Sequence, residues 1–303
     1  MTPDITVAVV SYNTCGLLRS CLRSLEARQA EGEAALEIVV ADNASADGSA
    51  AMVRAEFPAV RVLEMGENAG FGRANNAALT GAGGRYVCLV NSDAEVQSGA
   101  LRDALTFLDA HPDVGVVGGQ LVWPDGREQP SWSRDPTPGS VLAEQLFLPP
   151  RRLPPLPNGG DVPQVCGAFM VVRRAAWEAV GGFDSHYFMY NEDVDLNVRL
   201  RGAGWRLALL PGVRITHHLG ASSRADWQTR ARMVSAYNAS RVYYFGRHSG
   251  PAAARRVKLY CLLGAALRLG GWSLIAVVRP AARDKVRLFR EVWRQTWATT
   301  AGN

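Results

Sequence analysis

Five short polar clusters each follow an apolar stretch, and their side chains are of types that bind nucleotides, metal ions and hydroxyl groups. They are Ser11-Tyr12-Asn13, Asp42-Asn43, Asn91-Ser92-Asp93, Glu192-Asp193 and His217-His218. The first three follow runs rich in Val, Ile and Leu at residues 5–10, 37–41 and 86–90, which suit strands buried on both faces. Because ligands bind at the carboxyl ends of strands in open α/β sheets, we expect these clusters to share a ligand.

Asp93 is a candidate metal ligand. It leaves a fully apolar segment at residues 87–90, where an ionised carboxylate needs a cation or hydrogen-bond donors. Mg²⁺ and Mn²⁺ commonly take one or two carboxylates together with phosphate oxygens of a substrate. The imidazole of His217, at the end of a later predicted strand, could complete the same site. The structural alternatives are a helix-capping Asp93 and a packed His217.

Glu192 and Asp193 are candidates for acid–base chemistry. Together with Asp195 they open a predicted helix, where the helix dipole by itself favours acidic residues. That structural explanation accounts for at least one of the three. Two adjacent carboxylates beside the aromatic run at residues 183–190 also suit a general base and a group that accepts a substrate hydroxyl.

Two further segments have the chemistry of a nucleotide site. Asp42 could accept the imide N–H of uracil or thymine, although residues 42–49 are turn-like and Asp47 could be an N-cap. Residues 68–76 join a strand to a helix, with glycines that allow close backbone approach and Arg73 available for a diphosphate. The spacing is neither that of a Rossmann fingerprint nor that of a Walker loop.

The intervening segments have the pattern of helices, at residues 15–28, 47–56, 71–80 and 99–110, each preceded or opened by Ser, Asp, Asn or Gly. Ser11-Tyr12-Asn13 taken alone favours a turn that caps the first of them. The βαβα alternation predicts an α/β fold, with a mainly parallel sheet flanked by helices and right-handed crossovers that bring the strand ends to one side.

The later part of the chain is less regular. Residues 205–210 and 213–216 predict two strands separated by Pro211-Gly212, and a strand is expected from Cys166, where the small Gly167 would let a ligand approach. Residues 139–165 are rich in proline, which predicts a loop over the site.

Composition places the chain among globular proteins. Its 303 residues are 48% apolar and 20% charged, which suits one large α/β domain with an appendage. No basic or apolar leader precedes the first predicted strand, so we expect the chain to remain in the cytosol. Its five scattered cysteines are expected to be reduced and structural. We expect no nucleic-acid partner, and a homodimer is left open.

The tail at residues 251–303 is both apolar and basic. Residues 259–278 have the length of a membrane span, but a central Arg268 costs about 2.5 to 3.5 kcal/mol on insertion scales, and Gly264, Gly270 and Gly271 weaken a helix. We therefore expect helices on the inner membrane surface; packing on the catalytic domain or a dimer interface is the alternative. The basic flanks and candidate interfacial anchors are Arg255, Arg256, Lys258, Arg279, Arg283, Lys285, Arg287, Arg290, Trp272, Trp293 and Trp297.

Taken in order, these motifs resemble family 2 glycosyltransferases of the GT-A fold over roughly residues 5–250. The resemblance rests on Asp-Asn-Ala-Ser-Ala-Asp-Gly-Ser at 42–49, Asn-Ala-Gly-Phe-Gly-Arg-Ala-Asn-Asn at 68–76, Asn-Ser-Asp at 91–93, Gly-Gly-Phe-Asp at 181–184, Asn-Glu-Asp-Val-Asp-Leu at 191–196 and His-His-Leu-Gly at 217–220. Within the family the chain is most similar to bacterial rhamnosyltransferases acting on polyprenyl-diphosphate-linked sugars. Trp-Pro-Asp-Gly at 123–126 and Pro-Ser-Trp-Ser-Arg at 130–134 add to that similarity.

The resemblance implies a catalytic domain at residues 1–250 that performs an inverting transfer from a nucleotide-diphosphate sugar, which we expect to be dTDP-rhamnose. The acceptor would be a polyprenyl-diphosphate-linked saccharide in cell-wall, O-antigen or capsule biosynthesis, and the enzyme would be peripheral on the inner face of the cytoplasmic membrane. A transferase using UDP-galactose, UDP-glucose or UDP-N-acetylglucosamine is the first alternative. A non-enzymatic nucleotide-sugar-binding protein is the second.

The same resemblance assigns roles to individual residues. Asp193 is the expected catalytic base, and Asp93 and His217 are the expected contacts of Mg²⁺ or Mn²⁺. Asn91 stands where the family's metal motif often has a second acid, which implies a modest metal affinity. The residues expected to bind the donor are Ser11, Tyr12, Asn13, Asp42, Asn68, Gly70, Arg73, Asn75 and Ser92, and those expected to bind the acceptor are Gly167, Glu192 and Trp132.

Overall fold

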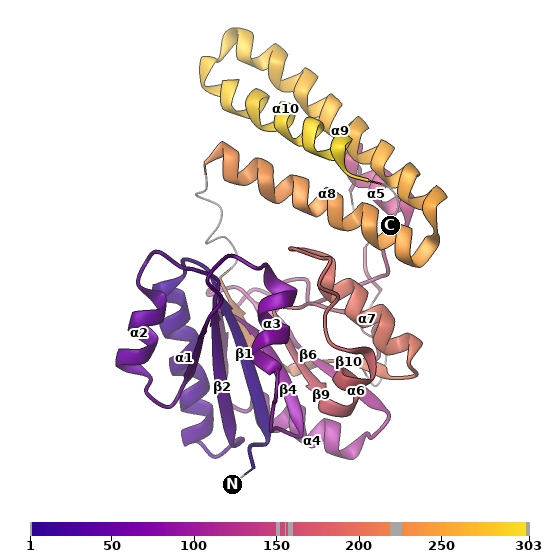
Figure 1. Cartoon of the computed structure of the whole chain (residues 1–303). Helices are drawn as coiled ribbons and strands as arrows, with labels where there is room; N and C mark the ends of the chain where they lie inside the picture. Colours follow the sequence, from indigo (N-terminus) through magenta and orange to yellow (C-terminus); the bar gives the residue numbers. More distant parts are fainter. Residues whose placement is uncertain (1, 150–151, 155, 157–159, 219–225, 301–303) are drawn as a thin grey trace. The chain divides into compact units, whose positions relative to one another are not determined.

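An eight-stranded sheet organises most of the chain before residue 218 (Figure 1). The computed structural model describes residues 2–149, 152–154, 156, 160–218 and 226–300. The strands, in the order β3-β2-β1-β4-β9-β6-β10-β5, are β1 (Ile5–Ser11), β2 (Leu36–Asp42), β3 (Arg61–Glu64), β4 (Tyr86–Asn91), β5 (Ala94–Val96), β6 (Val114–Val122), β9 (Phe169–Arg173) and β10 (Arg206–His217). Only β9 and β5 run antiparallel to their neighbours, so the expected mainly parallel sheet is confirmed.

The register of the central strands brings the first polar clusters to one edge. β1 pairs in parallel with both β2 and β4, with Ser11 opposite Asp42 and Val10 opposite Asn91. All three strands are buried along most of their length, as their continuous apolar runs require. The polar residues that end these strands therefore lie next to one another.

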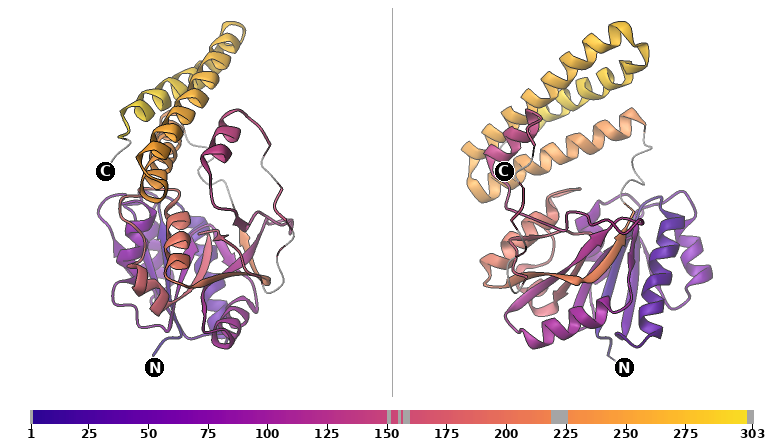
Figure 2. Two further views of the ribbon diagram at one scale, coloured as in Figure 1. Left: turned by 90° about the vertical axis from the view of Figure 1, so that its right-hand side faces the viewer. Right: turned by 180° about the vertical axis from the view of Figure 1, so that it is seen from behind.

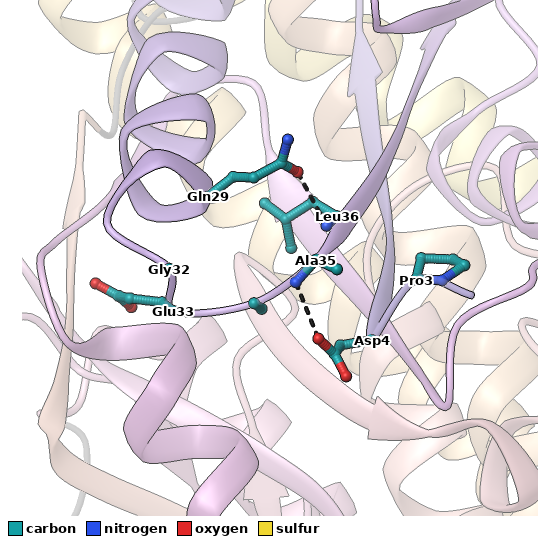
Figure 3. A pocket seen from close by; sticks show the side chains of 8 residues that line it. Pro3, Asp4, Gln29, Gly32, Glu33, Ala35 and Leu36 are labelled. Carbon is teal, nitrogen blue, oxygen red and sulfur yellow. Dashed lines mark hydrogen bonds between the residues drawn. The ribbon is translucent and has the colours of Figure 1, made fainter. Parts of the chain in front are cut away.

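The opposite ends of β1 and β2 line a pocket of about 460 Å³ (Figure 3). Its polar side chains are used within the protein: Asp4 Oδ2 and Gln29 Oε1 each accept a backbone N–H from the segment that leads into β2, both at 2.9 Å. Glu33 accepts hydrogen bonds from the backbone N–H groups of Gly99 and Leu101, at 2.6 and 3.0 Å. It therefore caps the start of helix α4 (Ala100–Ala110). The pocket contains none of the residues predicted to bind a ligand.

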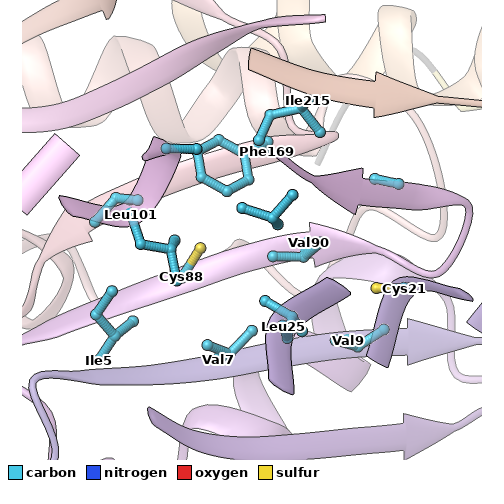
Figure 4. Packing of buried hydrophobic residues seen from close by; sticks show 14 of the residues in the cluster. Ile5, Val7, Val9, Cys21, Leu25, Cys88, Val90, Leu101, Phe169 and Ile215 are labelled. Carbon is cyan, nitrogen blue, oxygen red and sulfur yellow. The ribbon is translucent and has the colours of Figure 1, made fainter. Parts of the chain in front are cut away.

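Helices cover both faces of the sheet (Figure 2). They are α1 (Cys15–Ala30), α2 (Ser49–Glu56), α3 (Phe71–Leu79), α4 (Ala100–Ala110), α6 (Arg174–Val180) and α7 (Glu192–Gly202). One apolar layer joins α1, α2 and α4 to the sheet, with Leu25 and Leu101 near Cys88 and Val90 (Figure 4). A second layer packs α3, α6 and α7 on the other face, around residues such as Leu196. All five cysteines are free, and burial raises the pKa of the Cys88 thiol.

Three local predictions were wrong in detail. The two strands expected at 205–210 and 213–216 form one strand, β10, over Arg206–His217. It has a register shift between Leu210 and Arg214, because the chain resumes pairing with β6 after Pro211, which has no N–H to donate. The strand expected from Cys166 begins at Phe169. The predicted loop from residue 139 contains α5 (Pro138–Gln145) and ends in β8 (Gln164–Val165), which pairs with β7 (Trp132–Ser133).

The α5 helix has a local signal that its proline-rich surroundings obscured. Thr137 and Ser140 form a reciprocal capping box, and Pro138 occupies the first turn, where a proline is tolerated. Of the predicted loop, positions 150, 151, 155 and 157–159 lie outside the described residues. Leu219 and Gly220, the last two residues of the His-His-Leu-Gly motif, also lie outside them.

The remaining helices belong to a second compact unit. The first unit comprises Met1–Arg134, Pro154–His186 and Glu192–Ala221. The second unit comprises Asp135–Leu153, Tyr187–Asn191 and Ser222–Asn303. The second unit contains α5, α8 (Trp227–Ser249), α9 (Pro251–Val278), a short 3₁₀ turn (Pro280–Ala282) and α10 (Arg283–Ala298). The boundary expected at residue 250 therefore falls inside this unit, between α8 and α9.

The α9 helix is continuous through the glycines that were expected to weaken it. Gly264 has a packing role, because a Cβ there would lie 1.9 Å from Oε1 of Gln145 on α5. Arg268 donates to the same Gln145 Oε1 at 3.2 Å and to the Gly264 carbonyl at 3.0 Å. By length and composition alone α9 could cross a membrane, with a mean hydropathy of 1.8 over its most apolar window.

Candidate active site

The loops after β1 and β2 are locked to each other. Asn13 Oδ1 accepts from Ala46 N at 2.8 Å, and Asn13 N donates to Ser45 Oγ at 2.9 Å. Asn13 and Ala44 both have left-handed backbone conformations, with φ of 54° and 60°. Non-glycine residues persist in this conformation only where surrounding contacts hold them, and such residues are common at ligand sites.

Asp42 is the last residue of β2, and its two carboxylate oxygens differ in their hydrogen bonding. Its Oδ2 accepts from Ser45 N at 3.0 Å, whereas its Oδ1 is buried and has no hydrogen-bond partner in the described structure. The residue is only 3% exposed. A buried carboxylate oxygen without a donor costs free energy. A ligand N–H at Oδ1 would relieve that cost.

The glycine-rich segment before α3 lies against this edge. Asn43 Nδ2 donates to the Gly70 carbonyl at 3.2 Å, and Asn43 Oδ1 is another buried oxygen without a partner among the described residues. Gly70 N donates to Asn68 Oδ1 at 3.1 Å, and the φ of 86° at Gly70 needs a residue without a Cβ. Asn68 and Gly70 are thus brought to the Asp42-Asn43 cluster.

The other residues predicted to bind the donor nucleotide-sugar lie in different environments. Ser11 and Ser92 are bridged by Thr14 Oγ1, at 3.0 and 2.9 Å, which ties the end of β1 to the end of β4. Tyr12 is half exposed at the same edge. Arg73 is exposed and donates from Nε to the Ser185 carbonyl at 2.9 Å.

Asn75 differs from those residues because its side chain is committed to its own helix. It is 1% exposed, and its Nδ2 donates to the Phe71 carbonyl at 3.0 Å. Thr14, by contrast, joins two of the predicted clusters and was missed by the sequence reasoning. Its position directly after Ser11-Tyr12-Asn13 was the available signal.

Asp93 and His217 lie together although 124 positions separate them. Asp93 Oδ1 is 3.3 Å from His217 Nε2, and the β5–β10 pairing with His217 opposite Ala94 brings them there. Their side chains are 18% and 5% exposed. His218, in contrast, directs its Nε2 to Glu95 Oε1 at 2.8 Å.

The pair suits a divalent cation that takes further ligands from a substrate. Carboxylate oxygen and imidazole nitrogen are both donors to Mn²⁺ and related ions. Among the described residues, no group of three His, Cys, Asp or Glu side chains could hold a metal by themselves. Phosphate oxygens and water would have to complete the coordination shell.

Asp193 is held by backbone N–H groups at the start of α7. Its Oδ2 accepts from Gly167 N at 3.0 Å and its Oδ1 accepts from Val194 N at 2.9 Å. A Cβ on Gly167 would lie 3.0 Å from Asp193 Cβ and 3.1 Å from Oδ2, so the glycine makes this approach possible. Burial raises the pKa of Asp193, the direction that makes a carboxylate a stronger base.

Glu192 is the more deeply buried member of the pair. Its Oε2 has no hydrogen-bond partner in the described structure, and burial together with the charge of Asp193 raises the pKa of Glu192 to about 8. The two residues before it, Tyr190 and Asn191, have left-handed φ values of 67° and 64°. The start of α7 therefore combines left-handed backbone at the two preceding residues with a buried carboxyl group whose pKa is raised.

Backbone contacts connect Asp193 to the metal-binding candidates. Asn91 N, at the end of β4, donates to the Ala168 carbonyl at 3.0 Å, next to the Gly167 that holds Asp193. Asp93 follows two residues later. Trp132 lies beside the segment that leads to Gly167, because it pairs with Val165 in β7–β8 and Cys166 N donates to the Ser131 carbonyl.

Comparisons with known proteins identify the family and the fold. The family model described as Glycosyl transferase family 2 matches residues 6–181. An N-acetylglucosaminyl-diphospho-decaprenol L-rhamnosyltransferase of Mycobacterium tuberculosis is 29% identical over 280 residues, which cover 82% of this chain and 87% of the relative. The O-antigen biosynthesis protein RfbC of Myxococcus xanthus is 28% identical over 236 residues, covering 74% of this chain and 18% of that protein.

Among solved structures, a mannosyltransferase from Pyrobaculum calidifontis in complex with GDP-Man and Mn²⁺ has a TM-score of 0.55 at 21% identity, covering 98% of this chain and 87% of that one. Staphylococcus aureus TarS residues 1–349 in complex with UDP-GlcNAc has a TM-score of 0.53 at 17% identity, covering 97% and 92%. At these identities the likeness shows the fold. It confirms the expected GT-A arrangement with a helical region after it.

Proposed function

Because this chain belongs to glycosyl transferase family 2, we propose that it transfers L-rhamnose from dTDP-rhamnose to a polyprenyl-diphosphate-linked saccharide in cell-wall, O-antigen or capsule assembly. The name of the Mycobacterium tuberculosis relative supports both the sugar and the lipid carrier. The observation that carries the proposal is the Asp193 carboxylate, held by Gly167 N beside the strand end that leads to Asp93 and His217.

The donor nucleotide binds at the carboxyl ends of β1 and β2 in this proposal. Asp42 Oδ1, buried and without a partner in the described structure, would accept the imide N–H of the base. Ser11, Tyr12, Asn13, Asn68 and Gly70 would surround the nucleotide from the same edge. Thymine and uracil present the same imide group, so this contact would also accept the base of a UDP-sugar.

Direct displacement at the anomeric carbon requires a base and a stabilised leaving group. A divalent cation bound by Asp93 and His217 would neutralise the leaving diphosphate. Asp193 would take the proton of the acceptor hydroxyl as its oxygen bonds to the anomeric carbon and the bond to the diphosphate oxygen breaks, which inverts the configuration. Glu192 and Trp132 would orient the acceptor, and Gly167, which holds Asp193, would lie beside it.

A calorimetric donor screen tests this function. dTDP-rhamnose, UDP-galactose, UDP-glucose and UDP-N-acetylglucosamine would be titrated into the full-length protein with and without Mn²⁺ or Mg²⁺. We expect metal-dependent preference for dTDP-rhamnose. Preference for a UDP-sugar would overturn the assigned donor but would keep the assignment as a glycosyltransferase. Binding of none of the four would overturn the enzymatic assignment itself.

We further propose that the second unit holds the enzyme on the inner membrane surface, where a polyprenyl carrier resides. The outer side of α9 exposes Leu259, Leu263, Leu267, Leu274, Val277 and Val278. On α10, Trp293 and Trp297 stack at 5.4 Å and are also exposed. Exposed Arg279, Arg283, Arg287 and Arg290 would meet anionic headgroups.

The placement of Arg268 favours a helix on the membrane surface over a helix that spans the bilayer. Its guanidinium lies 4.3 Å from the centre of the Phe147 ring and contacts Gln145, so it packs against the α5 region of the same unit. An arginine so placed satisfies its charge within the protein. It therefore leaves the opposite apolar face of α9 for lipid.

Sedimentation with vesicles tests the membrane proposal. We expect the full-length protein to bind vesicles with about 30% phosphatidylserine at low salt and to dissociate at high salt. Leu274→Glu combined with Val277→Glu should weaken binding at least tenfold, whereas Arg102→Glu, an exposed change on α4, should have little effect. Full-length protein that stays in the supernatant at low salt would contradict the proposal.

A further inference from the structure

Gln129 clamps His217 with both ends of its side-chain amide. Its Nε2 donates to the His217 carbonyl at 2.7 Å, and its Oε1 lies 3.2 Å from His217 Nδ1. The glutamine is 3% exposed, and its own backbone is fixed on both sides: Gln129 N donates to Leu121 O, and Gln129 O accepts from Gln120 Nε2. The amide therefore has little freedom to turn.

The backbone carbonyl of His217 determines which end of the amide faces the ring. A carbonyl oxygen can only accept, so the atom opposite it must be the amide nitrogen of Gln129. The amide oxygen, which also can only accept, then faces Nδ1. His217 Nδ1 must consequently carry a proton, whatever the neighbouring groups do.

This proton on Nδ1 determines what Nε2 can do. In the neutral ring Nε2 carries the lone pair, and it points to the position shared with Asp93 Oδ1 at 3.3 Å. Asn91 Nδ2 lies 3.5 Å from the same nitrogen. A lone pair beside a carboxylate oxygen is an arrangement that a divalent cation between them would stabilise.

We propose that Gln129 is a positioning residue that holds His217 as the Nδ1–H tautomer, so that Nε2 and Asp93 together bind a divalent cation. The proposal rests on the metal site of the proposed function and adds a residue that would set the affinity of that site. Loss of such an outer hydrogen bond typically lowers metal affinity by about 10- to 100-fold.

Two readouts on the full-length protein test this role. Long-range ¹H–¹⁵N spectra report the His217 tautomer, and electron paramagnetic resonance of free Mn²⁺ reports affinity in the presence of dTDP. We expect the Nδ1–H pattern in the unmodified protein. In Gln129→Met we expect loss of that pattern and Mn²⁺ binding at least about tenfold weaker.

Two control variants separate positioning from folding. Gln120→Met removes a buried amide that bonds Gln129 O and Ser131 Oγ but not His217. Gln129 N still donates to Leu121 O and Gln129 O still accepts from Ser131 Oγ, so the tautomer and the Mn²⁺ affinity should persist. Gln129→Glu keeps an acceptor opposite Nδ1 but loses the donor to the His217 carbonyl, so it should bind Mn²⁺ more tightly than Gln129→Met and less tightly than the unmodified protein.

The outcomes distinguish this inference from the proposed function. If the unmodified protein binds Mn²⁺ and Gln129→Met keeps both tautomer and affinity, the role of Gln129 is overturned while the metal site stands. Equal losses in Gln120→Met and Gln129→Met would also overturn it, because general disruption would then explain both. If the unmodified protein binds no Mn²⁺ with dTDP, the metal site of the proposed function fails as well.

Discussion

The two ends of β1 and β2 use their polar side chains in opposite ways. At the amino ends, a pocket of about 460 Å³ is lined by Asp4 and Gln29, whose oxygens accept backbone N–H groups of the protein. At the carboxyl ends, Asp42 Oδ1 and Asn43 Oδ1 are buried without a partner in the described structure. A hollow by itself therefore does not mark a ligand site. Buried polar atoms without internal partners are the stronger sign, because a ligand or a bound water must satisfy them.

The largest difference between the two ends should be in catalysis. Asp193→Asn keeps the size of the side chain but removes the base, so we expect kcat to fall by about 100- to 10,000-fold while calorimetric donor affinity stays nearly unchanged. Asp4→Asn at the amino end should leave kcat within about twofold. Normal turnover in Asp193→Asn would show that another group takes the proton.

Donor affinity should separate the two ends next. Asp42→Ala removes the oxygen proposed for the base, and a hydrogen bond to a charged group is worth about 1.5 to 3 kcal/mol, or roughly 10- to 100-fold in Kd. Asp4→Ala should leave the Kd for dTDP unchanged and lower only the melting temperature. Equal Kd values for dTDP in Asp42→Ala and Asp4→Ala would show that the carboxyl ends of the strands do not bind the nucleotide.

A smaller effect is expected from the glycine beside the base. In Gly167→Ala the new Cβ would press on Asp193 and displace its carboxylate by a few tenths of an ångström, so kcat should fall by about tenfold. Gly83→Ala at the amino end is the matched change, because its Cβ would meet Pro3 at an ordinary 3.5 Å. If both variants keep full kcat, the close contact has no catalytic consequence.

The smallest expected effect is on the pH dependence of stability. The folded-state pKa of Glu192, about 8, lies above the ordinary value of 4.5, so the folded protein binds more protons between these values. Stability should therefore fall as pH rises from about 4.5 to about 8. Glu192→Gln should flatten the melting temperature over this range relative to the unmodified protein. An unchanged slope would mean that Glu192 titrates normally.

Much of the sheet edge could be predicted from the sequence because its strands are continuous apolar runs that end in polar residues. β1, β2 and β4 have this pattern, and their parallel pairing then places Ser11 opposite Asp42. The antiparallel β9 was not predictable in this way. Its partners are β4 and β6, and a short apolar run does not reveal the direction of its neighbours.

The rest of the candidate site depends on contacts between distant residues. Gln129 meets His217 across 88 positions, and no local pattern indicates that pairing. Asn75 has the residue type of a ligand contact, yet its amide bonds Phe71 in its own helix, a choice that depends on packing. The α5 helix was hidden because prolines outweighed the capping box at Thr137.

The most direct test of the distinction between the two ends is to map backbone amide shifts while dTDP and Mg²⁺ are titrated into the full-length protein. We predict that the shifts concentrate at Asn13, Asn43 and Ala46, in the loops after β1 and β2, with the pocket residues at 29–36 unchanged. Shifts concentrated at residues 29–36, with the loops after β1 and β2 silent, would contradict it.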